Sequence, residues 1–302
     1  MVIRVGVMSD LHVEYDEDLI SRAQAQASRG LTDSVQIRWW RHITEREPTV
    51  GHPRLGPDLW AIQGVDLIFM AGDIWSGVRS VEYAGEVADY CGCPVALVAG
   101  NHDFYGADMA VAVPAMAAAA EATGGRVRFL DDTRTDFILD GRRLAVLGSV
   151  LWTDFCLHGA ERQAEAMKSA RWSLNDHLRI AIDGRHFMPL NALQLHERSR
   201  VWLADAVPRA RAEAEIVIVA VHHGVVPEAN AEEYRGDVLA PAFASDLTAD
   251  ILRWGADLVV SGHTHHPLDM TVGKTRIVSA PRGYIGSEPG SDSYVPQIVE
   301  LA

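Results

Sequence analysis

Cysteine is scarce in this sequence. The 302 residues include only Cys91, Cys93 and Cys156. An odd count without framework spacing excludes a disulfide-stabilised scaffold. We therefore expect three free thiols, the usual state of cysteine in a reducing cytoplasm.

Long apolar runs are also absent. No stretch approaches the roughly 20 residues that a transmembrane helix needs. The opening segment Met1–Met8 runs directly into Ser9 and Asp10 and lacks the layout of a secretion signal, so we expect a first strand there. The sequence predicts a cytoplasmic protein with no membrane partner.

Basic side chains are outnumbered. There are 27 Lys and Arg against 41 Asp and Glu, which gives a formal net charge of −14. A protein that grips a long nucleic-acid backbone usually shows a basic excess, so a nucleic-acid polymer is an unfavoured partner. A small phosphate-ester substrate stays open, because bound metal cations can invert the local field.

Apolar residues make up 48% of the chain, enough for a sizeable core. They gather in short runs rich in Val, Ile and Leu, a pattern typical of strands buried on both faces. These runs are Val2–Met8, Val65–Ala71, Pro94–Ala99, Arg143–Val150, Glu215–Val221 and Ala256–Val260. Helix-like stretches lie between them, at Val78–Tyr90, Asp108–Ala122, Ala160–Ile182, Pro189–Ala206 and Asp246–Trp254. This alternation predicts a single α/β domain over residues 1–302.

Two long segments interrupt the alternation. Residues 14–59 end in a Pro- and Gly-rich tail, and segments of this length usually form a lid or carry helices of their own. Residues 153–205 are mostly helical in pattern. We interpret both as insertions into the domain, the first as a lid and the second as a helical elaboration.

Polar side chains follow five of the predicted strands. In open α/β sheets, ligands bind outside the carboxyl ends of the strands. Asp, His and Asn are side chains that ligate divalent metals. The residues at these strand ends are Asp10 and His12, then Asp73, then Asn101, His102 and Asp103, then His222 and His223, and finally His263 and His265. Their repeated placement predicts a metal centre.

The residue types suit a pair of metals. Two ions about 3.5–4 Å apart need one short bridging carboxylate, and an Asp on a tight Gly-Asp turn such as Gly72-Asp73 fits that position. Two carboxylates do not neutralise two divalent ions, so the site stays positive. It would attract a phosphate and make hydroxide available near neutral pH.

The five blocks stand in a recognisable order. They are Asp10-x-His12, Gly72-Asp73, Gly100-Asn101-His102-Asp103, His222 and Gly262-His263-x-His265. From Asp10 to His265 the chain resembles the calcineurin-like metallophosphoesterases. The resemblance implies a four-layer α/β/β/α sandwich and two divalent ions, with Mn²⁺, Fe, Zn²⁺ and Co²⁺ all compatible with these ligands.

The resemblance also implies a role for each residue. One ion would be held by Asp10, His12 and His265, the other by Asn101, His222 and His263, with Asp73 bridging. His102 would act as general acid or as a cationic stabiliser of the phosphate, oriented by Asp103. His222 and His223 are adjacent, and because side chains alternate along a strand, only one should face the metals. Family usage favours His222.

Short segments around Trp152, Asn175 and Arg282 resemble a bacterial subgroup of the family. We place His223, Trp152 and Arg282 near the substrate. Trp152 would wall the pocket or pack in the core. Arg282 would clamp a phosphate oxygen or pair with a carboxylate. In Asn175-Asp176-His177 the first two residues would cap or flank a helix, and the histidine would be satisfied or exposed.

The leading functional hypothesis is a hydrolase of small phosphodiesters or phosphomonoesters, in which a hydroxide bridging two metals attacks phosphorus. A nuclease or a protein phosphatase of the same fold is an alternative, although no basic stripe or peptide groove supports either. A non-catalytic metal-binding scaffold is another. Retention of His102 beside a full ligand set favours catalysis.

Overall fold

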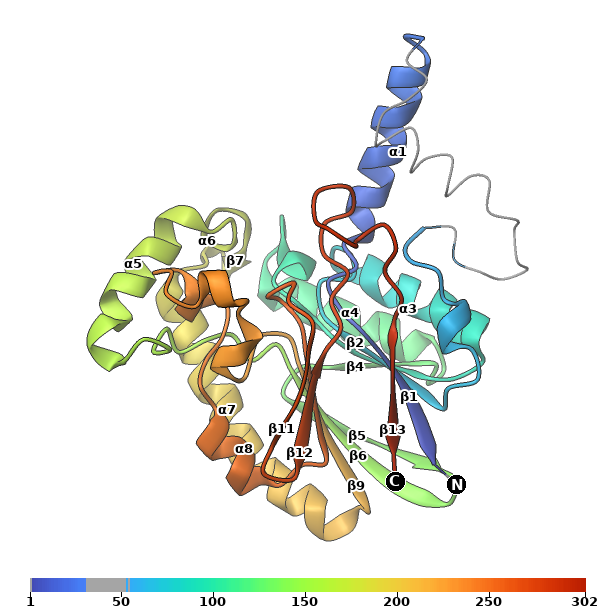
Figure 1. Cartoon of the computed structure of the whole chain (residues 1–302), viewed down its shortest axis with the longest axis vertical. Helices are drawn as coiled ribbons and strands as arrows, with labels where there is room; N and C mark the ends of the chain where they lie inside the picture. Colours follow the sequence, from blue (N-terminus) through green and yellow to red (C-terminus); the bar gives the residue numbers. More distant parts are fainter. Residues whose placement is uncertain (1, 31–52, 54) are drawn as a thin grey trace.

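The computed structural model describes residues 2–30, 53 and 55–302, and its strands form two main sheets (Figure 1). The first sheet has the order β13-β1-β2-β3-β4, with β1 to β4 parallel and β13 antiparallel to β1. Its strands are β1 (Ile3–Met8), β2 (Leu67–Ala71), β3 (Val95–Val98), β4 (Val127–Leu130) and β13 (Gln297–Leu301).

The second sheet has the order β11-β12-β10-β9-β6-β5. Its four inner strands are parallel, and β11 and β5 pair antiparallel at the two edges. Its strands are β5 (Thr133–Leu139), β6 (Arg142–Ser149), β9 (Ile216–Val221), β10 (Leu258–Ser261), β11 (Leu268–Val272) and β12 (Thr275–Ser279).

The six strands predicted from the sequence are confirmed as β1, β2, β3, β6, β9 and β10. The strands that were not predicted are β4, β5, β11, β12 and β13. The edge strands β5 and β11 consist mostly of partly buried and exposed residues, so they lack the continuous apolar run that marks an interior strand.

The two sheets pack face to face around an apolar layer. Side chains of β1 to β3 meet those of β6, β9 and β10 in this layer, which includes Phe69, Val98, Val146 and Ile218. At Gly148 a Cβ would lie only 2.9 Å from Val98, so the glycine permits close approach of the sheets. Buried inner faces explain why these strands read as continuous apolar runs.

Helices cover the two outer faces. The outer face of the first sheet packs against α3 (Val78–Cys91) and α4 (Met109–Ala122), and that of the second against α7 (Pro189–Glu213) and α8 (Thr248–Trp254). Asp108 caps α4 by accepting from the backbone N–H of Ala110. The result is the four-layer α/β/β/α sandwich that the family resemblance implied.

The stretch predicted as one helix over Ala160–Ile182 is broken into pieces. Helix α5 (Gln163–Ser173) ends because Leu174 is extended. The four-residue α6 (Asp176–Arg179) follows and ends at the extended Ile180. Residues 153–205 are mostly helical, but their first helix is not continuous.

A short hairpin follows α6 within the same insertion. It consists of β7 (Ala181–Ile182) and β8 (Arg185–His186). The turn residues Asp183 and Gly184 have φ of 50° and 72°. Positive φ at both positions is typical of a two-residue hairpin turn, for which Asp-Gly is a preferred sequence.

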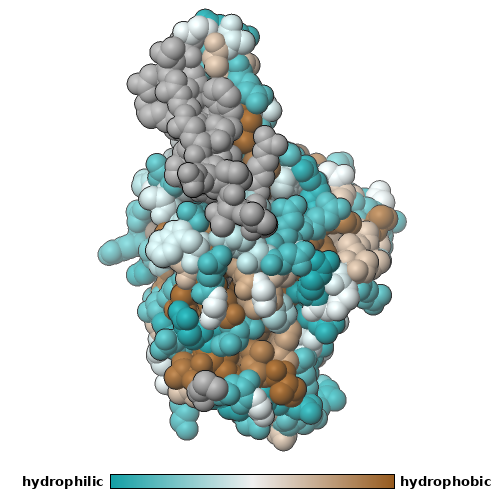
Figure 2. Space-filling model, turned by 90° about the vertical axis from the view of Figure 1, so that its right-hand side faces the viewer, coloured by the Kyte–Doolittle hydropathy of each residue, from teal (hydrophilic) through white to brown (hydrophobic). Residues whose placement is uncertain are grey.

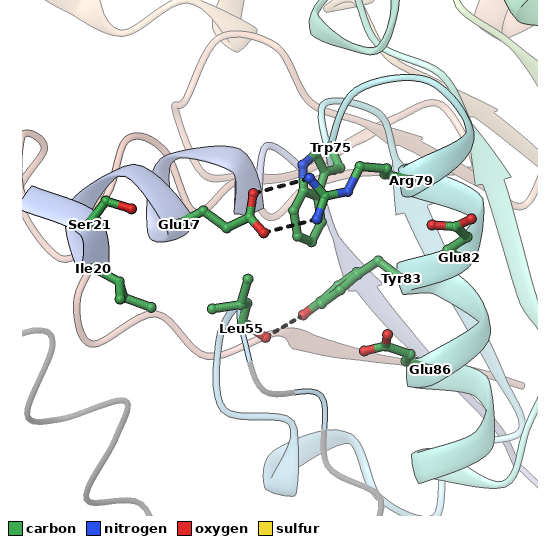
Figure 3. Close-up of a pocket in the computed structure, with 9 residues that line it drawn as sticks. All are labelled: Glu17, Ile20, Ser21, Leu55, Trp75, Arg79, Glu82, Tyr83 and Glu86. Atoms are coloured by element: carbon green, nitrogen blue, oxygen red, sulfur yellow. Dashed lines mark hydrogen bonds and ion pairs between the residues drawn. The ribbon is translucent and has the colours of Figure 1, made fainter.

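Helix α1 (Val13–Ala27) occupies the start of the segment predicted as a lid, and it projects from the body of the molecule (Figure 1). The rest of that prediction falls partly on residues 31–52 and 54, outside the described residues. Glu17 of α1 forms a two-pronged ion pair with Arg79 of α3, at 2.9 and 3.1 Å. This pair lies over Trp75 and lines a cavity of about 490 Å³ between the two helices (Figure 3).

The outer surface is largely polar on the face shown in Figure 2, with apolar areas mainly in its lower half. Among the helices of the described residues, none combines the length and the apolarity required to cross a bilayer.

Candidate metal centre

The seven predicted ligands converge at the carboxyl ends of strands from both sheets. Three sets of side chains each bring three donor atoms within 4.8 Å of one another. The sets are Asp10, His12 and His265, then His12, Asp73 and His102, and then Asp73, His222 and His263. Ligands far apart in the sequence therefore meet at the edge where α/β sheets commonly bind ligands.

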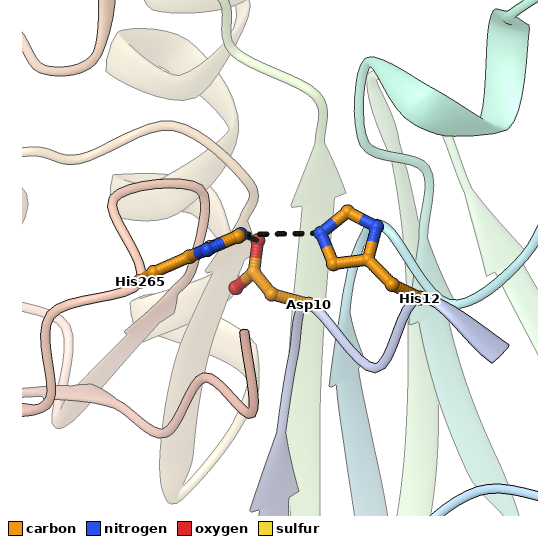
Figure 4. A group of neighbouring side chains, drawn as sticks. All are labelled: Asp10, His12 and His265. Carbon is orange, nitrogen blue, oxygen red and sulfur yellow. Dashed lines mark hydrogen bonds and ion pairs between the residues drawn. The ribbon is translucent and has the colours of Figure 1, made fainter. Parts of the chain in front are cut away.

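The first half of the centre consists of Asp10, His12 and His265 (Figure 4). The Nε2 atoms of His12 and His265 lie 3.1 Å apart, and Asp10 Oδ1 is 3.6 Å from His265 Nε2. Two donors bound to one ion at about 2.1 Å would be roughly 3.0–3.4 Å apart. The histidine pair fits that spacing.

The second half consists of His222, His263 and Asn101. His222 Nε2 lies 3.2 Å from His263 Nδ1 and 3.1 Å from Asn101 Oδ1. All three side chains are buried. This second group of close donors has the same spacing as the first.

Asp73 lies between the halves. Its Oδ2 is 3.9 Å from His12 Nε2 and 3.5 Å from His222 Nε2. Its other oxygen, Oδ1, accepts from the backbone N–H of His102 at 2.8 Å, which fixes the carboxylate in place. The geometry suits a bridging ligand for two ions.

The local backbone is strained at the ligands. Five of them, Asp10, His12, Asp73, His263 and His265, have φ between 47° and 70°. Non-glycine residues rarely adopt this left-handed conformation, and clusters of it mark functional sites.

Gly72 permits the tight turn before Asp73. It has φ of +87°, and a Cβ there would meet Nδ1 of His222 and come within 2.7 Å of the Gly100 backbone nitrogen. At Gly100 a Cβ would instead meet the Asp73 side chain. These two strand ends can approach each other only with glycine at both positions.

Hydrogen bonds at the outer ring nitrogens set the tautomers of three histidines. Nδ1–H of His12 donates to Glu14, at 3.3 Å, and that of His222 to the carbonyl of Ala71, at 2.7 Å. Nδ1–H of His265 donates to Glu288, at 2.8 Å. In each ring Nε2 therefore carries no proton, and its lone pair is available to bind a metal.

His102 lies beside Asp73 but outside the two ligand groups. Its Nδ1 is 3.6 Å from Glu14 Oε1, and its Nε2 is 3.2 Å from the hydroxyl of Tyr284. Burial disfavours its charge, yet the carboxylates of Asp73 and Glu14 raise the pKa of His102 above its usual value. A protonated imidazole at this position could donate a proton to a leaving group.

The side chain of Asp103, which was expected to orient His102, is hydrogen-bonded to other groups. Asp103 Oδ2 accepts from the backbone N–H groups of Asp73 and Gly100, at 3.0 and 2.8 Å, and Oδ1 accepts from the hydroxyl of Ser80. Burial, with the charge of Asp73, raises the pKa of Asp103 to about 7. Asp103 therefore connects the loops that carry Asp73 and Asn101. The carboxylate next to His102 Nδ1 is that of Glu14.

Two residues expected near the substrate lie behind the ligands. His223 is buried, its Nδ1–H donates to the carbonyl of Val150 at 3.2 Å, and its ring packs on that of His263 at 4.1 Å. Trp152 packs against His223, at 5.0 Å, and against Phe187, at 4.5 Å. Both residues support His263 from the core, and neither lines the cleft at the centre.

Arg282 forms a structural ion pair, the alternative left open by the sequence. Both of its terminal nitrogens donate to Asp16 at 3.0 Å, and one also donates to the carbonyl of Leu11. Both charged side chains are fully buried. The guanidinium fastens α1 to the loop after β12, so it does not clamp a phosphate.

A cleft of about 660 Å³ opens beside the centre, and its lining includes Asp73, Asn101, His102, His263 and His265. Among the described residues that line the cleft, none is Lys or Arg. Four carboxylates line it besides Asp73, namely Asp176, Glu233, Asp237 and Glu288. The anion-attracting charge would therefore have to come from the histidines and bound cations.

The sequence analysis gave no role to Glu14, Glu288 and Tyr284, which contact the centre. Glu14 follows His12 by two positions, so its nearness in sequence to a predicted ligand could have indicated it. Glu288 and Tyr284 come from the loop after β12, where neither spacing nor strand pattern marks them. They reach His265 and His102 only through the tertiary fold.

Known proteins resemble this chain in family and in fold. A family model described as calcineurin-like phosphoesterase matches residues 3–267. A solved structure of phosphopantetheinyl hydrolase from Mycobacterium tuberculosis has 16% identity and a TM-score of 0.60, over 99% of this chain and 96% of that one. The protein TT1561 of Thermus thermophilus has 12% identity and a TM-score of 0.47, over 100% and 99%. No curated protein matches the chain in sequence.

Proposed function

Because this chain belongs to the calcineurin-like phosphoesterase family, we propose that it hydrolyses a small phosphodiester with two divalent metal ions. The observation that carries the proposal is the position of Asp73. Its Oδ2 lies 3.9 Å from His12 Nε2 and 3.5 Å from His222 Nε2, between two complete groups of donors.

The donor sets fit the two ions. Asp10, His12 and His265 would hold one, Asn101, His222 and His263 the other, and Asp73 would bridge them. When bound, such ions polarise phosphoryl oxygens and lower the pKa of water. Mn²⁺, Fe, Zn²⁺ and Co²⁺ all accept this mixture of imidazole and oxygen ligands.

His102 is the proposed general acid. It lines the cleft beside Asp73, and its Nε2 faces the hydroxyl of Tyr284. Glu14, near the opposite ring nitrogen, favours the protonated imidazole. In this role His102 gives its proton to the departing alkoxide, a step worth roughly 10²–10⁴ in rate.

The charge of the cleft favours a diester over a monoester. A monoester brings up to two negative charges, whereas a diester brings one. The described lining holds carboxylates such as Glu233 and Asp237 and neither Lys nor Arg, so nothing beyond the histidines and the metals offsets extra anionic charge. An uncharged alcohol is the leaving group that this lining suits best.

The same charge pattern argues against a nuclease, since a polymer would bring further phosphates past these carboxylates. A scaffold role would require the metals but would not require an imidazole at position 102, where His102 faces the cleft. A protein phosphatase would act on a monoester, which the lining disfavours.

The proposal is tested by stripping the protein with a chelator, restoring Mn²⁺ and following two chromogenic substrates. We expect metal-dependent turnover of bis-p-nitrophenyl phosphate that exceeds turnover of p-nitrophenyl phosphate. Preference for the monoester would contradict the diester assignment and indicate a phosphatase. No turnover of either by protein carrying two metals would contradict catalysis and favour the scaffold.

A second panel should contain natural diesters with uncharged alcohols. A phosphopantetheinyl diester belongs in it, because the structural neighbour from Mycobacterium tuberculosis carries that activity in its name and the pantetheinyl arm bears no charge. If only diesters whose leaving group carries an additional negative charge are hydrolysed fast, the cleft does not favour uncharged alcohols and the proposal is contradicted.

A further inference from the structure

Asp176 reaches the metal centre from the helical insertion. It lies on α6 and is 6% exposed. Its Oδ1 accepts from Nδ2 of Asn101 at 2.8 Å and from the hydroxyl of Tyr105 at 2.7 Å. The sequence analysis expected Asn175 and Asp176 to cap or flank a helix, but the side chain of Asn175 makes no cap hydrogen bond, and these contacts of Asp176 point to the metal centre.

The Asn101 amide has two different ends, and only one can bind a metal. Its Oδ1 lies 3.1 Å from His222 Nε2, within the second donor group. Its Nδ2 points the other way, toward Asp176. A flip of the amide by 180° would turn the NH₂ group toward the metal position, where it offers no ligand.

An ionised carboxylate only accepts hydrogen bonds. Asp176 therefore stabilises the orientation in which Asn101 presents Nδ2 to it and Oδ1 to the donor group. The flipped amide would place its Oδ1 against the Asp176 oxygen, so two acceptors would repel each other in a buried setting. Asp176 thus selects the orientation that metal binding needs.

The backbone around Asp176 is fastened to the loop that carries Asn101 and His102. The N–H of Gly106 donates to the carbonyl of Arg179 at 2.8 Å, and the N–H of Ala181 donates to the carbonyl of Ala107 at 2.9 Å. The guanidinium of Arg179 also covers the ring of Tyr105 at 4.6 Å. These contacts hold Asp176 at a fixed distance from Asn101.

We propose that Asp176 is a positioning residue that sets the Asn101 amide for the second metal, so that the inserted helix α6 completes the metal centre of the sandwich. The inference rests on the proposed function in one respect only, that Asn101 ligates a metal. Loss of the Asp176 carboxylate should lower metal affinity, in addition to any effect on turnover.

The test is a titration of the chelator-stripped full chain with Mn²⁺ alone, followed calorimetrically. The parent should bind two ions. In Asp176→Ala the affinity for one of them should fall about 10–100-fold, as when other outer partners of metal ligands are removed, and the other should be unchanged. Asp176→Asn keeps an acceptor oxygen at the same place and should retain most of the parent affinity.

A double-mutant cycle shows whether the effect passes through Asn101. Asn101→Ala alone should weaken the same ion, and adding Asp176→Ala should weaken it no further. The control is Glu165→Ala on α5, which removes a carboxylate from the same insertion at an exposed ion pair with Arg162. It should leave both affinities unchanged.

The outcomes separate the two proposals. A parent that binds fewer than two Mn²⁺ ions contradicts the proposed function itself. A parent that binds two, with unchanged affinities in folded Asp176→Ala or additive losses in the cycle, overturns the positioning role alone. If Asp176→Ala does not fold, loss of the second ion in Asp176→Asn overturns that role, because the acceptor would still be present.

Discussion

The two halves of the metal centre are supported in different ways. In the first half, Nδ1 of His12 and of His265 donates to the carboxylates of Glu14 and Glu288, which are partly exposed and come from α1 and from the loop after β12. In the second half, Nδ1 of His222 donates to the backbone carbonyl of Ala71 inside the first sheet.

The difference affects how each half responds to change. A carboxylate partner makes an imidazole a stronger donor, but the support depends on a side chain at the periphery. A backbone carbonyl is fixed by the sheet ladder. The histidines of the first half should therefore respond to single substitutions of Glu14 or Glu288, and His222 only to changes that move the strand ends. In the second half, the ligand held by a side chain is Asn101, through Asp176.

Asp73 belongs to both halves, so its loss should have the largest effect. Asp73→Asn should lower diester hydrolysis by about 10³-fold or more, because metal stabilisation worth several kcal/mol is lost at about 1.4 kcal/mol per tenfold in rate. Metal content and turnover together check this. Asp89→Asn, at an exposed ion pair with Arg126, is the matched control. Turnover near the parent level in Asp73→Asn would show that the halves are not joined there.

His102 belongs to neither half. His102→Gln should reduce kcat roughly 10²–10⁴-fold through loss of the general acid, while both metals stay bound. Steady-state kinetics with elemental analysis of the same sample separates the two effects. Loss of metal in this variant would instead place His102 among the ligands.

Much of this centre could be predicted from the sequence. Asp10, Asp73, His222 and His263 directly follow buried strands, and parallel strands bring their carboxyl ends to one edge, so a local pattern was enough. The same patterns gave the inner strands β1, β2, β3, β6, β9 and β10, but not the inner strand β12.

The supports of the ligands could not be predicted in this way. Glu288 lies 23 residues from His265, and Asp176 lies 75 residues from Asn101. Each pairing depends on how a loop or an inserted helix folds back, which no strand or helix period encodes. For Arg282 the sequence left two roles open, and its ion pair with the buried Asp16 also depends on the tertiary fold.

Glu288→Gln tests the first half of the centre. It replaces the charged partner of His265 by a neutral one and should weaken one of the two metals by about 10–100-fold without affecting the other. The comparison is Glu165→Gln, an exposed carboxylate on α5. Calorimetric Mn²⁺ titration gives both affinities, and equal weakening of the two ions would contradict separate halves.

Gly72→Ala tests the half built into the strand ends. Its Cβ would meet His222 Nδ1 and press on the Gly100 backbone at φ +87°. Gly92→Ala shares a positive φ, +70°, but has open space around it. Both should lose about 1–3 kcal/mol in free energy of unfolding from the backbone conformation. Only Gly72→Ala should also weaken metal binding, so equal metal affinity in the two variants would exclude the clash.

The most direct test is a crystal structure of the protein with Mn²⁺, with the ions located by anomalous scattering. Two peaks about 3.5–4 Å apart are expected. One should lie against Asp10, His12 and His265, the other against Asn101, His222 and His263, with Asp73 between them. A single peak, or two peaks without Asp73 between them, would contradict the two-metal centre.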